Sequence, residues 1–156
     1  MITLQRTRDM DVIREIARDS RIWDQMADDH SGSREEYEPP SDGAVYVAVM
    51  LNGRAEGFFA LIPKTPTRIE VHTCLTPDLS PWQKMEAGAQ LPRWVWANTS
   101  CIRIYTEIPT CNQAAYGFAK ACGMTQSGVE PQCFLKGGVL HDVYVMGMNR
   151  PTIEQG

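Results

Sequence analysis

The segment Asn112-Gln113-Ala114-Ala115-Tyr116-Gly117-Phe118-Ala119-Lys120-Ala121-Cys122-Gly123-Met124 carries the clearest local signal in the chain. Asparagine favours the position before the first turn of a helix, and the alanines that follow are strong helix formers. Gly123 can adopt the left-handed backbone conformation that commonly ends a helix. The segment therefore predicts a helix over Asn112–Cys122 with a defined beginning and end.

Strand-like segments precede this helix. Ala44–Leu51 is rich in valine and is followed by Asn52-Gly53, a dipeptide that accepts the positive φ angles of a tight hairpin turn. Further strands are predicted at Gly57–Ile62, Arg68–Leu75 and Ile102–Ile108, with a break at Pro63–Pro66. The middle of the chain therefore predicts a mostly antiparallel sheet.

The N-terminal residues 9–26 predict two helices after a short strand at Ile2–Arg6. Asp9-Met10-Asp11 opens the first helix, and Ser20 can cap the second. The first helix has three apolar residues spaced along one face: Ile13, Ile16 and Ala17. The acidic segment Ser31–Gly43 contains prolines and glycines, so it predicts an exposed loop.

The longest predicted helix follows the strand at Arg68–Leu75. Ser80-Pro81-Trp82-Gln83 has the form of a helix start, because Ser80 can cap the first turn and Gln83 can return a hydrogen bond to it. The helix would run to about Asn98, and Pro92 inside it predicts a kink or a later start. A closing hairpin is predicted from Gln132–Lys136, Gly137-Gly138 and Val139–Met148.

The predicted order is β-α-α-β-β-β-α-β-α-β-β, which indicates an α+β fold with a mixed, mostly antiparallel central sheet flanked by helices. This order, together with Asn112, Ala115, Phe118, Gly123 and Met124, resembles the GNAT N-acetyltransferase superfamily. The segments Ser127-Gly128, Lys136-Gly137-Gly138, Asp142 and Tyr144–Met148 are most similar to its ribosomal-protein-acetylating and phage-encoded branches. We expect residues 1–150 to form a single GNAT-like domain, followed by a short tail at 151–156.

The resemblance implies that acetyl-CoA, as cosubstrate, lies in a V-shaped opening between the strands at Arg68–Leu75 and Ile102–Ile108. Its diphosphate would meet the helix that begins near Pro81, where backbone N–H groups and the helix dipole favour an anion. The cofactor-binding residues implied in this way are Leu75, Thr76, Gln83, Lys84, Met85, Asn112 and Phe118. For Asn112, a plain role as helix cap is an equal alternative.

One stretch departs from the family pattern. The family's phosphate loop reads Arg/Gln-x-x-Gly-x-Gly/Ala, whereas the matching stretch Ser80–Met85 has no glycine. Pro81 lacks an N–H donor, and the capping box would occupy others. Gln83 and Lys84 could still contact phosphate through their side chains. The alternative reading is a catalytically inactive GNAT-fold binding or structural protein of the phage-encoded kind, with a degenerate CoA loop.

Candidate chemistry lies on the strand at Arg68–Leu75. Strand alternation places Glu70, His72 and Cys74 on one face, and acyl transfer to an amine needs a base that takes the amine proton. Glu70 and His72 are therefore the catalytic candidates, since histidine titrates nearest neutral pH. The alternative is a hydrogen-bonded polar pair on an exposed sheet face. The tyrosine that often serves the family as acid is replaced by Ala119, with Tyr116 about one helical turn earlier.

Composition narrows the partners and the location. The net charge of −4 disfavours a nucleic-acid partner, which needs clustered lysine and arginine. Five cysteines without a C-x-x-C pair argue against a disulfide framework and against a metal site. The N-terminus lacks the layout of a secretion signal, and no apolar run approaches the roughly 20 residues that span a bilayer. We therefore expect a cytoplasmic protein that binds no membrane.

The resemblance implies an amine-bearing small molecule or protein as substrate. Several acids flank the region where the family admits substrate, and they would either steer a cationic amine or form a plain solvated loop: Asp28, Asp29, Glu35, Glu36 and Glu38. Trp94 and Trp96 cannot share one helical face, so one of them is a candidate for a homodimer or partner-protein surface, against ordinary core packing.

Overall fold

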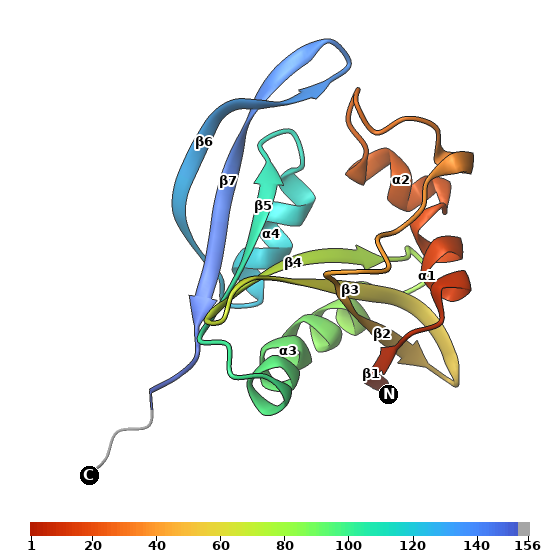
Figure 1. Ribbon diagram of the computed structural model, residues 1–156, viewed down its shortest axis with the longest axis vertical. Helices are drawn as coiled ribbons and strands as arrows, with labels where there is room; N and C mark the ends of the chain where they lie inside the picture. The colour runs from red at the N-terminus through yellow and green to blue at the C-terminus, as the bar shows by residue number, and fades with distance from the viewer. Residues whose placement is uncertain (153–156) are drawn as a thin grey trace.

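A seven-stranded mixed sheet organises the computed structural model, which describes residues 1–152 (Figure 1). The spatial order is β1-β2-β3-β4-β5-β7-β6. The strands are β1 (Ile2–Thr7), β2 (Val45–Leu51), β3 (Arg54–Thr65), β4 (Arg68–Leu75), β5 (Arg103–Pro109), β6 (Thr125–Lys136) and β7 (Val139–Asn149). Neighbouring strands are antiparallel, except for the parallel pair β4 and β5. This is the α+β arrangement that the sequence predicted.

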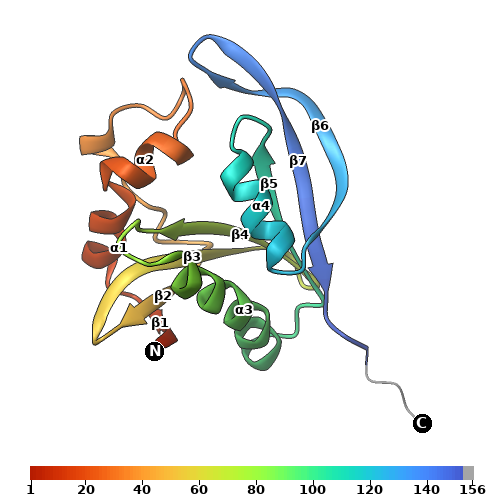
Figure 2. The same ribbon diagram turned by 180° about the vertical axis from the view of Figure 1, so that it is seen from behind.

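Helices cover both faces of the sheet (Figures 1 and 2). The helices α1 (Met10–Ala17) and α2 (Ser20–Met26) lie on one face, and α3 (Pro81–Asn98) and α4 (Gln113–Ala121) lie on the other. A short 3-10 helix, η1 (Arg34–Glu36), interrupts the loop before β2. Each face has its own apolar core, because the strands alternate their side chains between the two faces.

Local sequence signals account for most helix ends. The Ser80 hydroxyl accepts a hydrogen bond from the Gln83 N–H, and the Gln83 side chain accepts one from the Ser80 N–H, so the predicted capping box of α3 is present. Asn112 caps α4 by accepting a hydrogen bond from the Ala115 N–H. Gly123 follows α4 with a φ of +98°, as expected for a residue that ends a helix.

Three predicted boundaries were wrong. β3 extends to Thr65, into the break predicted at Pro63–Pro66, and the chain turns only at Pro66-Thr67. Pro63 lies at a register shift opposite Ile69, where a missing N–H is tolerated. Asp19, not Ser20, caps α2 by accepting a hydrogen bond from the Arg21 N–H. β6 begins at Thr125, well before the predicted Gln132; two register shifts and its mostly exposed residues hide the alternation that marks a strand.

The tryptophans of α3 differ in their burial. Trp94 and Trp96 are both partly buried against the core of the α3 and α4 face, whereas Trp82 is 81% exposed.

Helix α3 begins at Pro81 and contains Pro92, so the alternative of a later start is wrong. No helix within residues 1–152 is long and apolar enough to cross a membrane. Pro151 and Thr152 of the expected tail are exposed, and its other residues lie outside the described part.

Leu61 and Leu140 allow a matched test of the core, since Leu61 is 2% exposed and Leu140 is 52% exposed. Leu61→Ala is expected to lower the free energy of unfolding by about 2–5 kcal/mol, because it removes buried methyl groups and leaves a cavity. Leu140→Ala is expected to change it by less than ~0.5 kcal/mol. Urea unfolding measures both, and equal losses would contradict the placement of the core.

Candidate active site

The parallel strands β4 and β5 pair over only three residues and then separate. Their register joins Arg68–Glu70 to Arg103–Tyr105, and beyond this point the two strands diverge, as Figure 1 shows. A cavity of about 620 Å³ occupies the opening. It is lined by residues of β4, β5, α2, α3, α4 and β6, so the cavity joins the two faces of the sheet.

Strand alternation assigns the walls of this cavity to the two faces. Ile69 and Val71 pack in the core beside α3 and α4, whereas Cys74 packs in the core beside α1 and α2. His72 therefore points to the α1 and α2 side, while Leu75 points to the α3 and α4 side. A reactant could approach from each face and meet the other where the strands part.

Glu70 and His72 lie at that point. The His72 Nε2 is 2.5 Å from the Glu70 Oε1, and the Tyr105 hydroxyl donates a hydrogen bond to the Glu70 Oε2 at 3.1 Å. The Lys64 ammonium lies 3.6 Å from the same carboxylate. The Glu70 side chain is 13% exposed and the His72 side chain 49% exposed. His72 therefore lines the cavity, whereas Glu70 contacts His72 from outside the cavity lining.

Burial alone would raise the pKa of the Glu70 carboxyl. The hydrogen bond and charge of His72 act in the opposite direction, as do the Tyr105 hydroxyl and the Lys64 charge, and together they hold this pKa below its ordinary value. Glu70 is therefore a carboxylate at neutral pH. An ionised acceptor on one ring nitrogen orients the imidazole and leaves the other nitrogen free to take a proton.

Most of the cofactor candidates line the same cavity. These are Leu75, Lys84, Met85, Asn112 and Phe118. Asn112 lines the wall while its side chain caps α4, so the two alternatives for this residue coexist. Gly88 lets α3 approach α4 here: an added Cβ would lie 2.4 Å from the Cys122 Sγ and 2.9 Å from the Phe118 ring.

The N-terminus of α3 offers few free donors. The Gln83 N–H donates to the Ser80 hydroxyl at 3.1 Å, and the Lys84 N–H donates to the Ser80 carbonyl at 3.0 Å. Pro81 has no N–H. Within residues 1–152, the Trp82 N–H is the one donor of this first turn without a protein acceptor. The capping box has thus occupied the amides that a glycine-rich loop would present, and Gln83 itself does not line the cavity.

The remaining candidates for acid or nucleophile are weak. Ala119 is buried and carries no proton donor, and Tyr116 packs against Tyr144 and bonds to Gln126, outside the cavity lining. Burial raises the pKa of the Cys74 thiol to about 12, so this thiol stays protonated and is a poor nucleophile. Residues 1–152 contain no group of three or more histidine, cysteine or acidic side chains placed to hold a metal ion.

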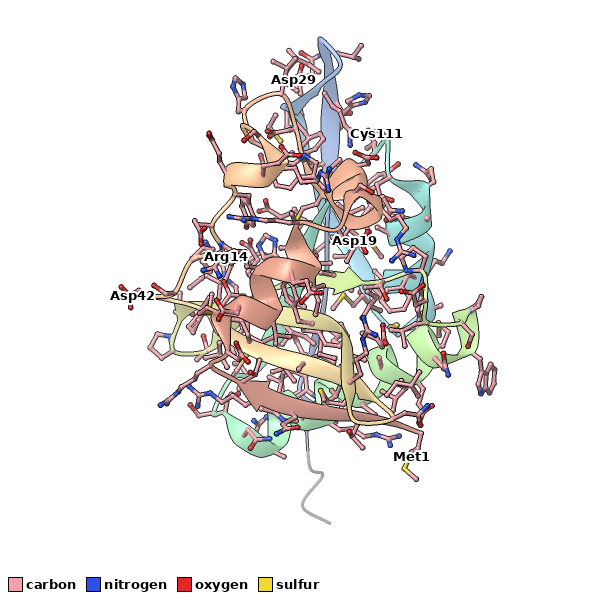
Figure 3. All side chains as sticks on the ribbon, turned by 90° about the vertical axis from the view of Figure 1, so that its right-hand side faces the viewer. Met1, Arg14, Asp19, Asp29, Asp42 and Cys111 are labelled. Carbon is pink, nitrogen blue, oxygen red and sulfur yellow. The ribbon has the colours of Figure 1, made fainter. Side chains whose placement is uncertain are left out.

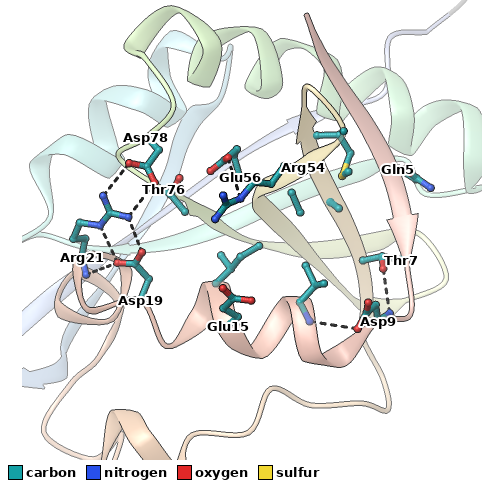
Figure 4. Close-up of a pocket in the computed structure, with 16 residues that line it drawn as sticks. Gln5, Thr7, Asp9, Glu15, Asp19, Arg21, Arg54, Glu56, Thr76 and Asp78 are labelled. Carbon is teal, nitrogen blue, oxygen red and sulfur yellow. Dashed lines mark hydrogen bonds and ion pairs between the residues drawn. The ribbon is translucent and has the colours of Figure 1, made fainter.

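A second cavity of about 650 Å³ lies between α1 and the strands β1 to β3 (Figure 4). Its carboxylates are largely engaged within the protein, since Asp19 and Asp78 both pair with Arg21. Thr76 lines this second cavity, not the opening between β4 and β5. Its hydroxyl is buried without a hydrogen-bond partner, and its N–H donates to the Glu56 carbonyl. This placement does not favour the cofactor role expected for Thr76.

Sequence reasoning missed three residues of the site. Tyr105 and Lys64 contact Glu70, and Phe134 of β6 lines the cavity. Alternation along Ile102–Ile108 could have placed Tyr105 on the same face as Glu70, but only if the register between the two strands had been known from the sequence. No local signal marks Phe134, which comes from the far end of the chain.

Comparisons of the whole structure identify the fold. The chain superposes on spermidine N-acetyltransferase from Vibrio cholerae, in complex with CoA and spermine, with a TM-score of 0.78 and 16% identity over 95% of both chains. It superposes on a probable GNAT-family acetyltransferase from Chromobacterium violaceum with a TM-score of 0.74 and 16% identity, over 95% of this chain and 82% of the other.

A third similar structure is aminoglycoside acetyltransferase AAC(6')-Ib in complex with coenzyme A and kanamycin, with a TM-score of 0.71 and 15% identity over 96% of this chain and 95% of the other. No protein-family model and no curated protein sequence matches the chain. At these identities the likeness concerns the fold, which is that of the GNAT acetyltransferases, as the sequence predicted.

His72→Ala is expected to raise the pKa of Glu70. The substitution removes the main interaction that lowers this pKa and leaves the burial that raises it. Tyr105→Phe removes a weaker interaction and should raise the pKa less. Because the folded-state pKa lies below that of the unfolded chain, the stability that Glu70 contributes is present above the unfolded value and is lost as the pH falls through the folded one.

Carboxyl ¹³C chemical shifts, followed through an acid titration, measure the Glu70 pKa in each variant. A pKa that is the same in the wild type and in both variants would show that neither side chain holds this carboxylate.

Proposed function

We propose that the protein is an N-acetyltransferase that moves an acetyl group directly from acetyl-CoA to an amine. The observation that carries the proposal is the cavity that joins both sheet faces where β4 and β5 part, with His72 on one wall. The cosubstrate would enter from the α3 and α4 side, and the amine from the α1 and α2 side. Acetyl-CoA supplies the activated thioester.

In this proposal His72 is the base. The amine nitrogen attacks the thioester carbonyl, the carbon–sulfur bond breaks, and the CoA thiolate leaves. His72 takes the proton that the amine loses, directly or through water. Glu70 bonds to one ring nitrogen and so orients the imidazole, and Tyr105 and Lys64 hold Glu70 in place. Solvent or the protonated His72 then protonates the thiolate, since Ala119 offers no acid.

Direct transfer is favoured over an acyl-enzyme. Cys74 is the cysteine nearest the base along β4, and its raised pKa makes it a poor nucleophile.

The free cysteines, two of them buried, suit a reducing compartment, which supports the expected cytoplasmic location. One sheet runs through the described chain, which supports a single domain over residues 1–150.

The diphosphate would be held mainly by a side chain. Lys84 lines the cavity at the first turn of α3, where the capping box leaves one amide free. An ammonium group at this point can replace part of what glycine-rich backbone amides supply to a diphosphate. Leu75, Met85 and Phe118 would form the apolar wall for the pantetheine arm.

The acceptor we propose is an amine-bearing small molecule. The similar structures include complexes with spermine and with kanamycin, both of which carry amines. A protein acceptor, as the resemblance to ribosomal-protein-acetylating branches implies, remains the alternative for the substrate.

A second function is favoured by the closed N-terminus of α3. A GNAT-fold binding or structural protein of the phage-encoded kind would keep the architecture without needing free amides, and the capping box fits that role. The two proposals differ in a single property, which is binding of acetyl-CoA.

Thermal unfolding with and without acetyl-CoA separates them. A ligand at 100 times its Kd stabilises the folded state by about 2.7 kcal/mol. For a chain of this size the expected rise in Tm is roughly 5–10 °C. S-acetylpantetheine, which lacks the diphosphate, should give a smaller rise, and Lys84→Met should reduce the effect of acetyl-CoA more than that of S-acetylpantetheine. No rise at millimolar acetyl-CoA would favour the binding protein.

Given binding, His72→Ala is expected to lower kcat by about 10²-fold, because it removes the base. Glu70→Gln should lower kcat less, because it keeps the imidazole and removes only the negative charge of the carboxylate that bonds to it. His30→Ala, at an exposed histidine outside the cavity lining, is the matched control and should leave kcat unchanged. Thiol release from acetyl-CoA measures all three, and an unchanged kcat in His72→Ala would remove His72 from the mechanism.

A further inference from the structure

The tip of the β6–β7 hairpin is fastened to the segment that follows α2. The Asp29 carboxylate accepts hydrogen bonds from the Gly137 N–H and the Gly138 N–H, each at 2.8 Å. The Asp29 N–H donates to the Leu135 carbonyl at 2.9 Å, and the Lys136 ammonium bonds to the Asp24 carbonyl on α2. Figure 3 shows Asp29 at the end of the molecule where this hairpin turns.

The turn is shaped to hold a carboxylate. Gly137 and Gly138 have φ angles of +61° and +75°, a conformation that glycine adopts at little cost. Successive N–H groups in such a turn point the same way and form a small concavity for an anion. These two hydrogen bonds lower the pKa of Asp29, so the contact is charged at neutral pH. Asp29 is thus engaged by the hairpin and is not free to steer a cationic substrate, which was one of the two alternatives for the acids of this region.

This contact closes a ring around the acceptor side of the cavity. One wall is β4 with His72, a second is α2 with Ile22 and Met26, and a third is β5 with Pro109. The fourth is the hairpin, which contributes Phe134. Within the described residues, the Asp29 carboxylate supplies two of the four hydrogen bonds that join the hairpin to α2 and the segment after it, so its loss would leave only the contacts of the Asp29 N–H and of Lys136. With the carboxylate in place, an acceptor must pass inside a closed rim, into a cavity that also has to hold the pantetheine arm.

We propose that Asp29 is a specificity-determining residue that, by fastening the hairpin to α2, restricts the acceptor to slim, unbranched primary amines. The inference rests on the proposed acetyltransferase function. Asp29 touches neither reactant and acts through the position of the hairpin. Bulky amines are excluded because the rim cannot widen while the carboxylate is bound to the Gly137-Gly138 turn.

The experiment compares Asp29→Ala with the wild type on two sets of primary amines, unbranched alkylamines and amines that carry an adamantane cage. The measured quantity is the ratio of kcat/KM for caged over unbranched acceptors. We expect this ratio to rise about tenfold or more in Asp29→Ala, since a pocket contact that is removed commonly changes discrimination by 10-fold or more. Asp29→Asn, which keeps one acceptor oxygen, should give a smaller rise.

Asp24→Ala is the matched control. It removes a carboxylate from the same end of α2 but keeps the backbone carbonyl that Lys136 contacts, so the ratio should not change. Amide hydrogen exchange reports the contact without using activity: the Gly137 and Gly138 amides should exchange about tenfold faster or more in Asp29→Ala and at the wild-type rate in Asp24→Ala.

The outcomes separate the two proposals. If Asp29→Ala stays folded and active with faster exchange at Gly137 and Gly138 but an unchanged ratio, the contact exists and does not select acceptors, and this inference is overturned while the proposed function stands. A rise of the same size in Asp24→Ala would also overturn it. If the wild type binds acetyl-CoA but acetylates no amine in either set, this inference is overturned while the proposed acetyl transfer stands. If the wild type fails to bind acetyl-CoA, the proposed function fails, and the inference fails with it.

Discussion

The separation of β4 from β5 is the constraint on which the rest of the molecule depends. Parallel strands in a sheet ordinarily exchange hydrogen bonds along their length, and here they do so only over Arg68–Glu70 and Arg103–Tyr105. Beyond that point each of the two strands has one edge without a hydrogen-bonded neighbour. In a compact domain, the backbone groups of such an edge need other partners or a covering by other parts of the chain. Residues of α3, α4 and the hairpin β6–β7 line the cavity at this gap.

Glu70 and Tyr105 mark the point where the strands part, and their hydrogen bond ties the two strands together at their last paired position. The polar pair of Glu70 and His72 thus has a structural role and lies at the mouth of the gap. A hydrogen-bonded polar pair and a candidate base are therefore compatible descriptions of the same residues. The half-exposed imidazole lines the cavity, which agrees with the role proposed for it.

The N-terminus of α3 shows the opposite tendency. Its capping box and Pro81 stabilise the helix end with the protein's own groups, and so remove donors that a diphosphate would use. A cavity that reaches both faces of the sheet favours the enzyme. A helix end whose amides are already hydrogen-bonded favours weaker binding of the CoA diphosphate. Lys84 is where the two observations can be reconciled, because it brings a cation to the same turn.

The sequence by itself determined the element order, the capping of α3 and α4, the turn at Asn52-Gly53 and the shared face of Glu70 and His72. Each of these depends on residues that are neighbours in the chain, so propensity, spacing and alternation decide them. It failed at Pro63 and at the start of β6, where register shifts break the alternation. Only the tertiary structure decided that Tyr105 holds Glu70, that Thr76 faces another cavity, and that Asp29 binds a turn 109 residues away. Such contacts depend on how strands are aligned and how far they diverge, which is fixed by packing of the whole sheet and carries no local signature.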